Sequence, residues 1–498
     1  MTVPGTIYRR LLFHPLKRFV KDDTREYKGL EMLVASMHVA NAIDRTCKTD
    51  HVGLLLPTSG AFPIAALAGW MTGRVIVPLN YLLKPEELQY VVDDADLDTI
   101  VTVQPMLDYL DRPPTGKRLI KLDEMNFKSI PRPRLPSSFK PDDLACLLYT
   151  SGTSGKPKGV MLTHANLEAA IKSACKHAEI SPRDVFLGVL PQFHCFGLID
   201  LTLLPLVHGC CVVYTARFNP AKILELARER RPTILIQIPA MFNALANAKS
   251  GTPEDLESLR YCVSGGEPLS DSVAKRFKEK FGVTINEGFG MTETSAASNW
   301  CLPHMYKPHS VGPALPGVRA RIVDTDSGEE LPPGTDGELQ LKGPTIMKGY
   351  YKLPEVTEET FTEDGYLRTG DMARIDEDGH VYITGRIKEM LIVGGENVYP
   401  REIEEVLDSH PSVNASGVVG RPDDSRGEVP IAFVEPCEDA QIDKQELLNL
   451  CRDRLSNYKV PKEIRVIEEL PRNPTGKVLR RDLRAIIDSE AQNAGASA

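Results

Sequence analysis

The sequence predicts an α/β protein with a large layered N-terminal domain, a small β-rich subdomain within it, and a separate small α+β domain at the C-terminal end. The chain has 498 residues, more than one hydrophobic core usually serves. From about residue 29 to residue 290, strand-like runs alternate with helix-like segments, a pattern typical of largely parallel sheets. Short β-runs with turn dipeptides follow, and helical segments return later. We therefore expect an N-terminal domain over 1–385, its β-rich subdomain at about 310–385, and a C-terminal domain over 386–498.

Individual elements can be predicted in order along the chain. Clear strand candidates are HVGLLLP, VIVPLN, TILIQIP and RYCVSGG. The segment SDSVAKRFKEKF predicts a helix capped by Ser270, with Val273, Phe277 and Phe281 on one stripe that faces the core. In the C-terminal domain, PREIEEVLDS opens with Pro400 at a helix start and repeats Ile403, Val406 and Leu407, and DKQELLNLCRDRL predicts a second helix.

Composition and charge favour a reduced, cytoplasmic protein that acts on small molecules. The net charge of −9 argues against a nucleic-acid partner held by phosphate neutralisation. Ten cysteines lack C-x-x-C spacing, and Cys210 and Cys211 stand in an apolar strand-like run. The most apolar regions, around 52–79 and 197–215, are interrupted by Pro, Gly and polar residues, so no transmembrane segment is expected.

The N-terminal stretch is basic and amphipathic but lacks the pattern of a secretory signal. Arg9, Arg10, Lys17 and Arg18 permit at most a loose peripheral contact with anionic lipid, and a solvated first helix is the commoner explanation of such a stretch.

The first chemical signal is YTSGTSGKPKGV, from Tyr149 to Val160, between the strand-like CLLYT and a helix capped by Thr163. Its glycines, hydroxyls and lysines predict a loop that surrounds phosphate oxygens. The loop is not a Walker A motif, because Pro157 follows Lys156 where Ser or Thr is needed. A flexible surface turn is the alternative. The residues predicted to bind phosphate are Thr150, Ser151, Gly152, Thr153, Ser154, Gly155, Lys156 and Lys158.

This loop resembles the signature of the adenylate-forming superfamily, which includes acyl-CoA synthetases, adenylation domains of peptide synthetases and firefly-type luciferases. Further motifs similar to the family's follow in the family's order: GFGMTET, YLRTGD, GRIKEMLIVGGENVYPREIE and NPTGKVLRR. The resemblance is greatest to fatty acid–CoA ligases. It implies an ATP-dependent acid–thiol ligase that uses Mg²⁺ and coenzyme A, with the C-terminal domain mobile.

The resemblance also implies a role for individual residues. Lys477 would be the catalytic cation, Thr292 would hydrogen-bond the α-phosphate, and Glu293 would hold the metal. Phe289 would offer a face to adenine, Asp371 would accept from both ribose hydroxyls, and Arg386 would reach the ribose or a phosphate. The remaining residues expected around the nucleotide are Gly266, Glu267, Pro268, Glu287, Gly288, Gly290, Met291 and Ile383.

For the second half-reaction, the family rotates its small domain, and Lys388 lies at the hinge position just past Arg386. The residues expected to line the acid and coenzyme A tunnels are His194, Phe196, Gly265, Gly266, Gly394, Gly395 and Glu396.

The substrate is expected to be a hydrophobic acid. His194 stands where amino-acid-activating relatives commonly carry an Asp, and histidine offers no fixed negative charge for an ammonium group; a core histidine is the alternative reading. Phe193, Phe196 and Leu198 favour an apolar acid, most simply a medium- or long-chain fatty acid. The alternatives are an acyl-AMP or acyl-carrier-protein ligase, an aryl-CoA ligase, and a non-catalytic nucleotide sensor. The last would be expected to have lost Lys477 or Glu293.

Overall fold

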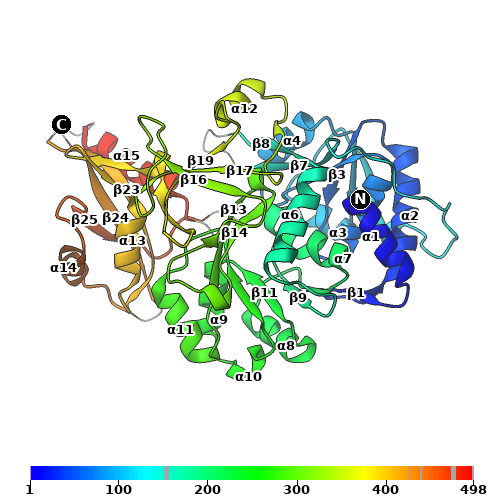
Figure 1. The fold of residues 1–498 in the computed structure, drawn as a ribbon, viewed down its shortest axis with the longest axis horizontal. Coiled ribbons are helices and arrows are strands. Elements are labelled where there is room, and N and C mark those ends of the chain that lie inside the picture. The colour runs from blue at the N-terminus through cyan, green and yellow to red at the C-terminus, as the bar shows by residue number, and fades with distance from the viewer. Residues whose placement is uncertain (1, 151–155, 424, 438–439, 473–477, 496–498) are drawn as a thin grey trace.

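The computed structural model describes residues 2–150, 156–423, 425–437, 440–472 and 478–495. They form a large N-terminal domain of two sheets and a β-rich unit, with a smaller C-terminal domain at one end of the molecule (Figure 1). The predicted α/β class is thereby confirmed. The exact domain boundaries stay a prediction.

A seven-stranded sheet contains the first predicted strands, in the order β18-β8-β7-β4-β3-β5-β6. Its five strands β3 to β7 pair in parallel, and β8 and β18 add antiparallel strands at one side. The strands are β3 (His51–Leu55), β4 (Val75–Pro78), β5 (Thr99–Thr102), β6 (Arg118–Lys121), β7 (Leu144–Thr150), β8 (Lys158–Thr163) and β18 (Gly349–Tyr350). The helices along this part of the chain are α2 (Gly29–Thr46), α3 (Ala61–Met71), α4 (Pro85–Asp94), α5 (Gln104–Tyr109), η1 (Leu122–Glu124) and α6 (His164–His177).

The strand β8 was not predicted. The residues after the phosphate loop were expected to lead directly into a helix, yet Val160 and Leu162 are buried while Met161 between them is half-buried, which is the period of a strand. β8 pairs antiparallel with β7, so that Thr150 stands opposite Lys158. The predicted cap of the following helix is confirmed, because the Thr163 hydroxyl accepts a hydrogen bond from the backbone N–H of Asn166 at 3.1 Å.

A second, eight-stranded sheet has the order β14-β13-β12-β11-β9-β10-β1-β2 and is parallel from β1 to β13. Its strands are β1 (Arg18–Lys21), β2 (Glu26–Lys28), β9 (Val185–Gly188), β10 (Cys211–Tyr214), β11 (Ile234–Gln237), β12 (Tyr261–Ser264), β13 (Asn286–Met291) and β14 (Ala296–Trp300). Its helices are α1 (Val3–Phe13), the π-helix η2 (Phe196–Leu203), α7 (Leu204–His208), α8 (Pro220–Arg230), α9 (Pro239–Asn247), α10 (Pro253–Leu256), α11 (Asp271–Phe281), η3 (Thr292–Thr294) and η4 (Pro303–Met305).

The predicted stripe on α11 is confirmed. The Ser270 hydroxyl caps the helix by accepting from Val273 N–H, and Val273, Phe277 and Phe281 are buried. Phe277 packs edge-on against Phe242 of α9, with ring centroids 5.2 Å apart. Aromatic burial of this kind fixes α9 and α11 on the sheet and so fixes the ends of β11 to β13, where the candidate site lies.

The β-rich composition of 310–385 corresponds to a five-stranded antiparallel sheet in the order β15-β20-β19-β17-β16. Its strands are β15 (Gly312–Pro313), β16 (Arg319–Val323), β17 (Gly337–Lys342), β19 (Leu367–Ile375) and β20 (His380–Arg386), and the one helix among them is α12 (Pro354–Thr360). β20 ends at Arg386, and the short 3-10 helix η5 (Ile387–Glu389) follows it.

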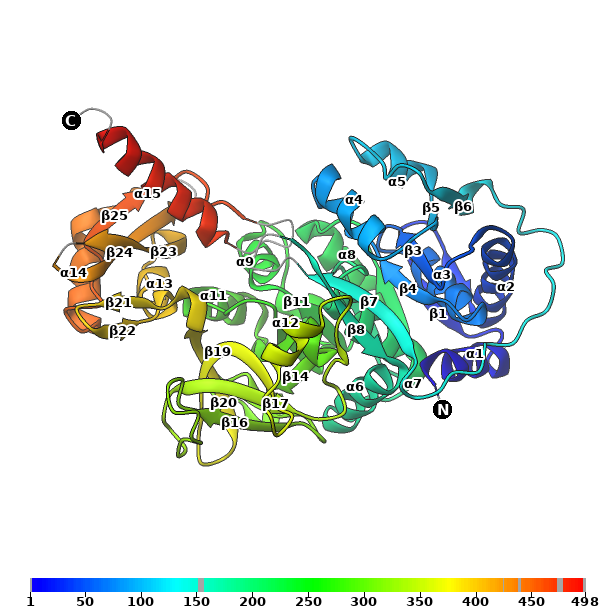
Figure 2. The same cartoon turned by 90° about the horizontal axis from the view of Figure 1, so that it is seen from above.

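The C-terminal domain has its own sheet, β22-β21-β24-β23, with β25 parallel to β24. Ile403 and Leu407 of one helix and Leu447 of another belong to a separate core, whereas Val406 is only partly buried. The strands are β21 (Leu391–Val393), β22 (Glu396–Val398), β23 (Val413–Asp423), β24 (Gly427–Pro436) and β25 (Glu463–Val466), and the helices are α13 (Pro400–Asp408), α14 (Lys444–Arg454) and α15 (Arg480–Gly495). Figure 2 shows this domain standing apart from the two large sheets.

Few polar contacts are seen between the two domains in the described part of the chain. The Asn243 amide on α9 donates to Asn414 Oδ1 at 2.9 Å, and Arg401 donates to the carbonyl of Ile383. An interface held by so few hydrogen bonds suits relative domain motion.

Two expectations about the whole chain can be compared with the structure. All ten cysteines are free thiols. None of the helices described here is both long enough and apolar enough to cross a bilayer.

In the basic N-terminal stretch, Arg10 and Lys17 donate to the carbonyls of Val207 and Gly209, and Arg18 pairs with Glu26. These contacts lie within the protein and do not test lipid binding, so peripheral lipid contact stays a prediction.

Candidate active site

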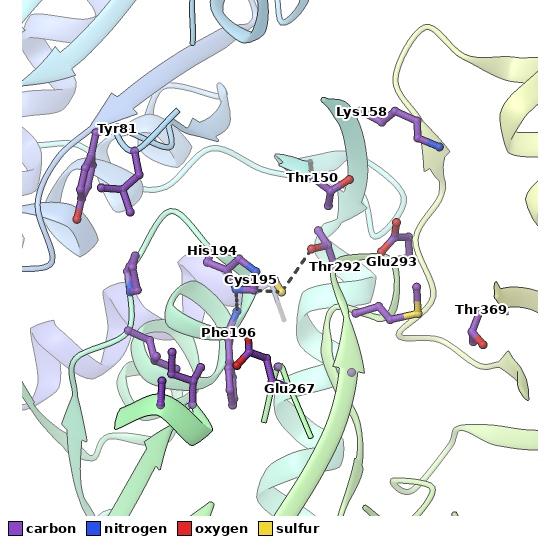
Figure 3. Close-up of a pocket in the computed structure, with 18 of the residues that line it drawn as sticks. Tyr81, Thr150, Lys158, His194, Cys195, Phe196, Glu267, Thr292, Glu293 and Thr369 are labelled. Atoms are coloured by element: carbon purple, nitrogen blue, oxygen red, sulfur yellow. Dashed lines mark hydrogen bonds between the residues drawn. The ribbon is translucent and has the colours of Figure 1, made fainter. Parts of the chain in front are cut away.

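A cleft of about 1210 Å³ brings together residues from the large sheets, the β-rich unit and η5. Predicted site residues from motifs far apart in the sequence share its wall, as Figure 3 shows for several of them. Those that line it are Thr150, Lys158, His194, Phe196, Gly266, Glu267, Gly290, Met291, Thr292, Glu293, Arg386 and Lys388.

Thr292 and Glu293 lie in η3, the tight turn between β13 and β14. The turn is closed by the Thr294 hydroxyl, which accepts from Met291 N–H at 2.9 Å and donates to the carbonyl of Ala296 at 2.7 Å. Thr292 Oγ1 donates to Cys195 Sγ at 3.5 Å, so this hydroxyl is oriented from across the cleft. The turn therefore presents one hydroxyl and one carboxylate to the same space.

Glu293 is held by Tyr350, whose hydroxyl donates to Glu293 Oε1 at 2.8 Å. Burial raises the pKa of Tyr350, and the nearby Glu293 carboxylate raises it further, so the phenol stays protonated as a donor. Lys158 Nζ lies 4.6 Å from the centre of the Tyr350 ring, which keeps a positive charge close to Glu293. The Glu293 carboxylate suits a metal ion, and the Lys158 ammonium beside it suits a phosphate bound to that metal ion.

Gly290 allows the β13–β14 turn to close. A Cβ at this position would lie 2.0 Å from the Ala296 carbonyl oxygen, far inside contact distance. We therefore predict that Gly290→Ala destabilises the protein by about 3 kcal/mol, because backbone atoms must move. The matched control is Gly379→Ala, at a left-handed φ of 82° with no atom within 4 Å, which should cost about 1 kcal/mol from backbone conformation alone. Equal losses in urea unfolding would contradict the steric explanation.

The two lysines of the phosphate loop are placed differently. Lys158 lines the cleft, whereas Lys156 is exposed and its Nζ lies 5.4 Å from the centre of the Tyr90 ring. Ser151, Gly152, Thr153, Ser154 and Gly155 lie outside the described residues.

Asp371 and Arg386 face each other on β19 and β20. The two are register partners, and Arg386 Nε lies 2.9 Å from Asp371 Oδ1. Asp371 is buried and its backbone N–H donates to Thr369 Oγ1 at 3.1 Å. Arg386 and Thr369 line the cleft beside it, so a carboxylate and a guanidinium are available together for hydroxyls or phosphate.

His194 faces the cleft opposite Thr292 (Figure 3). Its Nδ1 accepts from Phe196 N–H at 3.4 Å, which leaves Nε2 for a ligand. The surrounding protein lowers the pKa of His194 through desolvation, so the ring is neutral at neutral pH. The core-histidine alternative is not what the structure shows, because the ring is exposed to the cleft.

A second, smaller cavity of about 60 Å³ shares His194, Cys195, Phe196, Gly266 and Gly290 with the large cleft. A Cβ on Gly265 would lie 3.0 Å from the Phe196 ring, so glycine keeps this space open. The other residues that line it are mostly apolar: Ala174, Ile180, Phe186, Leu204, Ile236, Val263, Gly288, Phe289, Ala296, Ala297 and Trp300, with Asp200 and Asn299 as the polar exceptions.

Several predicted residues lie elsewhere. Phe289 lines the smaller cavity and not the large cleft, because its strand pairs with β14 and turns the ring towards the core. A stacking role on adenine is therefore not supported by its position. Glu287 does not line the large cleft; its carboxylate accepts from Leu269 N–H at 3.3 Å, and burial raises its pKa.

The remaining predicted residues are spread more widely. Pro268 is exposed, and the carbonyl of Ile383 accepts a hydrogen bond from Arg401. Gly394 and Gly395 form the exposed tip of the β21–β22 hairpin, with Glu396 beside them, and none of these three lines either cavity. Lys477 lies outside the described residues.

Three residues of the site were missed by sequence reasoning. Tyr350 follows Glu293 by 57 positions and reaches it only because β18 pairs with β8. Cys195 was passed over beside His194, and Asp200 stands within an apolar helix where no motif marks it. A single charged residue in LIDLTL was the one available signal for Asp200.

Comparison with known proteins identifies the family. Residues 11–351 match the family described as AMP-binding enzyme, and residues 402–477 match the AMP-binding enzyme C-terminal domain. The chain belongs to the AMP-binding enzyme family. The predicted superfamily is thus confirmed, and this AMP-binding enzyme is an acid–CoA ligase in the broad sense that covers its relatives.

Named relatives of this AMP-binding enzyme differ in their acids. It is 37% identical to a sulfoacetate–CoA ligase of Cupriavidus necator over 86% of both chains. It is 34% identical to a feruloyl-CoA synthase of Amycolatopsis, over 87% of this chain and 88% of that one. It is 32% identical to a long-chain-fatty-acid–CoA ligase of Bacillus subtilis, over 90% and 86% respectively. Family membership alone therefore does not identify the acid.

Solved structures of similar proteins have the same fold. ATP-bound MatB from Rhodopseudomonas palustris superposes with a TM-score of 0.89 at 31% identity, covering 98% of this chain and 99% of that one. The o-succinylbenzoate coenzyme A synthetase MenE of Bacillus subtilis, in complex with ATP and magnesium ion, gives 0.85 at 29% identity, covering 96% and 99%.

Proposed function

We propose that this AMP-binding enzyme joins a hydrophobic carboxylic acid of about medium-chain fatty-acid size to coenzyme A, using ATP and Mg²⁺ and releasing AMP and pyrophosphate. One observation carries the proposal: a single cleft brings Thr150, Lys158, Thr292 and Glu293 together opposite His194, at the mouth of an apolar cavity. The hydroxyl and charged groups of Thr150, Lys158, Thr292 and Glu293 suit a nucleoside triphosphate with its metal ion. The apolar cavity beside His194 suits an acid whose tail is apolar.

The first half-reaction needs no general base from the protein. A carboxylic acid is ionised at neutral pH, so its oxygen can attack the α-phosphorus while pyrophosphate leaves. Thr292 and Lys158 are placed to donate to phosphate oxygens, and Lys477 is proposed to add a further positive charge. Arg386 and Asp371 would hold the ribose.

Glu293 is suited to be the protein's ligand for Mg²⁺. Hard divalent cations prefer carboxylate and phosphate oxygens, and Lys158 beside Glu293 matches a phosphate held close by. Among the residues that the structure describes, no cluster of three or more His, Cys, Asp or Glu forms a ready-made metal site. The cation, when bound, would neutralise phosphate charge, with most of its other ligands supplied by the nucleotide.

The second half-reaction is proposed to follow a rotation of the C-terminal domain. The thiol sulfur attacks the acyl carbonyl carbon, and AMP leaves. Lys388 in η5 lies between β20 and the C-terminal sheet, where a change of backbone angles moves the whole domain. The exposed Gly394–Gly395 turn would then approach His194 and line the path of the thiol.

The acid is proposed to be compact. The apolar walls of the smaller cavity support a hydrophobic tail, as the sequence predicts, but its limited volume supports the long-chain end of the fatty-acid range least. An aryl acid is the second candidate, because the space is bordered by Phe196, Phe289 and Trp300 together with glycines that leave room for a flat ring.

A substrate screen tests the proposal. Purified enzyme would be supplied with ATP, Mg²⁺ and short, medium, long and aryl acids, with coenzyme A, with a carrier protein, or with neither acceptor. We expect AMP release that depends on both acid and coenzyme A, and fastest for compact apolar acids. If AMP were released with carrier protein but not with coenzyme A, the carrier protein would be the acceptor. If the chain bound nucleotide without any acid and released no AMP, it would be a sensor.

A further inference from the structure

A buried carboxyl group, that of Asp200, lines the smaller cavity, which is called the acid cavity below. Asp200 is part of the π-helix η2, is only 6% exposed, and lines the smaller cavity with Phe196 and Trp300. In the described chain, no group donates a hydrogen bond to its Oδ2. Burial raises the pKa of Asp200 to about 8.

Two other buried aspartates, Asp22 and Asp184, are satisfied by their own neighbours. Asp22 accepts from Thr24 and Tyr27, and although burial acts to raise its pKa, the bonds from the Thr24 hydroxyl and from several backbone N–H groups lower it. Asp184 accepts from Arg260 and Thr233. A buried carboxyl without such partners is costly to the fold, and leucine has nearly the same branched shape without that cost. Asp408 Oδ1 is also without a partner in the described residues, but Asp200 lines a cavity and Asp408 lines neither cavity, so a ligand best explains Asp200.

A second unpaired polar group borders the same cavity. Trp300 is 5% exposed, and its indole N–H has no hydrogen-bond acceptor in the described part of the chain. Trp300 lies on β14 and Asp200 on η2, two neighbouring elements that both line this cavity. The cavity lining thus offers a carboxyl group and an indole donor within largely apolar surroundings.

We propose that the acid used by this enzyme carries a hydroxyl group at the end remote from its carboxyl group, and that Asp200 and Trp300 bind this hydroxyl. The inference rests on the proposed function and deepens it. A hydroxyl both donates and accepts one hydrogen bond, so it satisfies Asp200 and Trp300 together. A methyl end can satisfy neither group, and an ammonium end cannot accept from the indole.

The position of Asp200 sets the size of the acid. Cys195, at the start of η2, accepts from Thr292 at the catalytic end of the site. Asp200 follows Cys195 by five residues, about one turn of the π-helix, which rises less per residue than an α-helix and so separates the two by roughly 6 Å along the axis. The hydroxyl should therefore stand about that far from the carboxyl group, as in 4-hydroxybenzoate or 6-hydroxyhexanoate.

Pairs of acids that differ only in the hydroxyl test the inference. We would measure kcat/KM for coenzyme A-dependent AMP release with 4-hydroxybenzoate against benzoate and 6-hydroxyhexanoate against hexanoate. In at least one pair, the unaltered enzyme should prefer the hydroxy acid by about 10-fold or more, because the plain acid leaves buried polar groups unpaired. Asp200→Leu should remove or reverse that preference, and Trp300→Phe should reduce it.

Stability measurements separate recognition from folding. Asp200→Leu should raise the thermal unfolding midpoint, since it removes an unpaired buried carboxyl group, and the gain should be larger at pH 8 than at pH 5. The sign follows because a carboxyl with a raised pKa in the folded state costs stability as pH rises from about 4 to about 8. A lower midpoint for Asp200→Leu would contradict the claim that Asp200 lacks partners within the protein.

The outcomes of these assays are distinguishable. If no acid gives coenzyme A-dependent AMP release, the proposed function fails. If acids are activated but the plain members of both pairs are used as well as the hydroxy acids, the assignment of Asp200 is overturned and the ligase function stands. A preference for 6-aminohexanoate over 6-hydroxyhexanoate would also overturn it, in favour of an ammonium group.

Discussion

Glu293→Gln is expected to lower kcat/KM for acid-dependent AMP release by about 100-fold or more, on the scale of losing one electrostatic group at a reacting phosphate. Glutamine keeps the shape of the side chain and can still accept from Tyr350, whose hydroxyl lies 2.8 Å from Glu293 Oε1. The substitution removes only the negative charge. Because an amide oxygen is a much weaker ligand than a carboxylate for a divalent cation, the variant should need more Mg²⁺ for half-maximal rate.

Tyr350→Phe is the matched control for this prediction. It leaves the carboxylate in place and removes one hydrogen bond that orients it, so a loss of about 10-fold is expected. The measurement is the initial rate of AMP release over a range of Mg²⁺ concentrations for both variants. If Glu293→Gln lost activity with an unchanged Mg²⁺ dependence, Glu293 would have to act on something other than the metal.

Local motifs explain which parts of the site were predictable. Gly290, Thr292 and Glu293 lie within four consecutive residues, and the turn they form is closed by Thr294 in the same segment. Their shared location could be predicted because the chain itself holds them together. Lys158 and Thr150 were predictable for the same reason, since β7 and β8 pair directly across the loop.

Residues that depend on distant packing could not be predicted. Tyr350 contacts Glu293 because β18 pairs with β8, and no local sequence pattern predicts that pairing. Asp200 reaches the acid cavity only because the apolar helix η2 is buried against β14. Phe289 was expected at adenine, but its direction is set by the pairing of β13 with β14. Strand pairing decides such directions through contacts far apart in sequence.

The fold was predictable where hydrophobic spacing is unambiguous. Val273, Phe277 and Phe281 recur at helical spacing over a full α11, and the prediction held. The β8 strand was missed because KGVMLT is a short apolar run, which spacing alone does not assign to strand or helix.

Lys477→Ala is expected to abolish adenylate formation, with a loss of about 100-fold or more, while leaving thioester formation from supplied acyl-adenylate largely intact. Two anions meet when the acid's carboxylate approaches the α-phosphate, so a positive side chain between them lowers the barrier. Lys477 lies outside the described residues, but Arg480 shortly after it pairs with Glu389 at 2.5 Å and with Glu404 at 2.6 Å. Glu389 lines the cleft, so Arg480 contacts a residue of the cleft wall.

The two half-reactions must be measured separately to test this division of labour. ATP–pyrophosphate exchange reports adenylate formation, and release of coenzyme A thioester from synthetic acyl-adenylate reports the second step. Lys388→Pro is the matched counterpart: a restrained hinge should spare exchange and slow thioester formation, because only the second step requires the domain to rotate. Equal loss of both steps in Lys477→Ala would show that the lysine supports the structure of the site as a whole. It would also contradict the proposal that the small domain rotates to remove Lys477 before the thiol attacks.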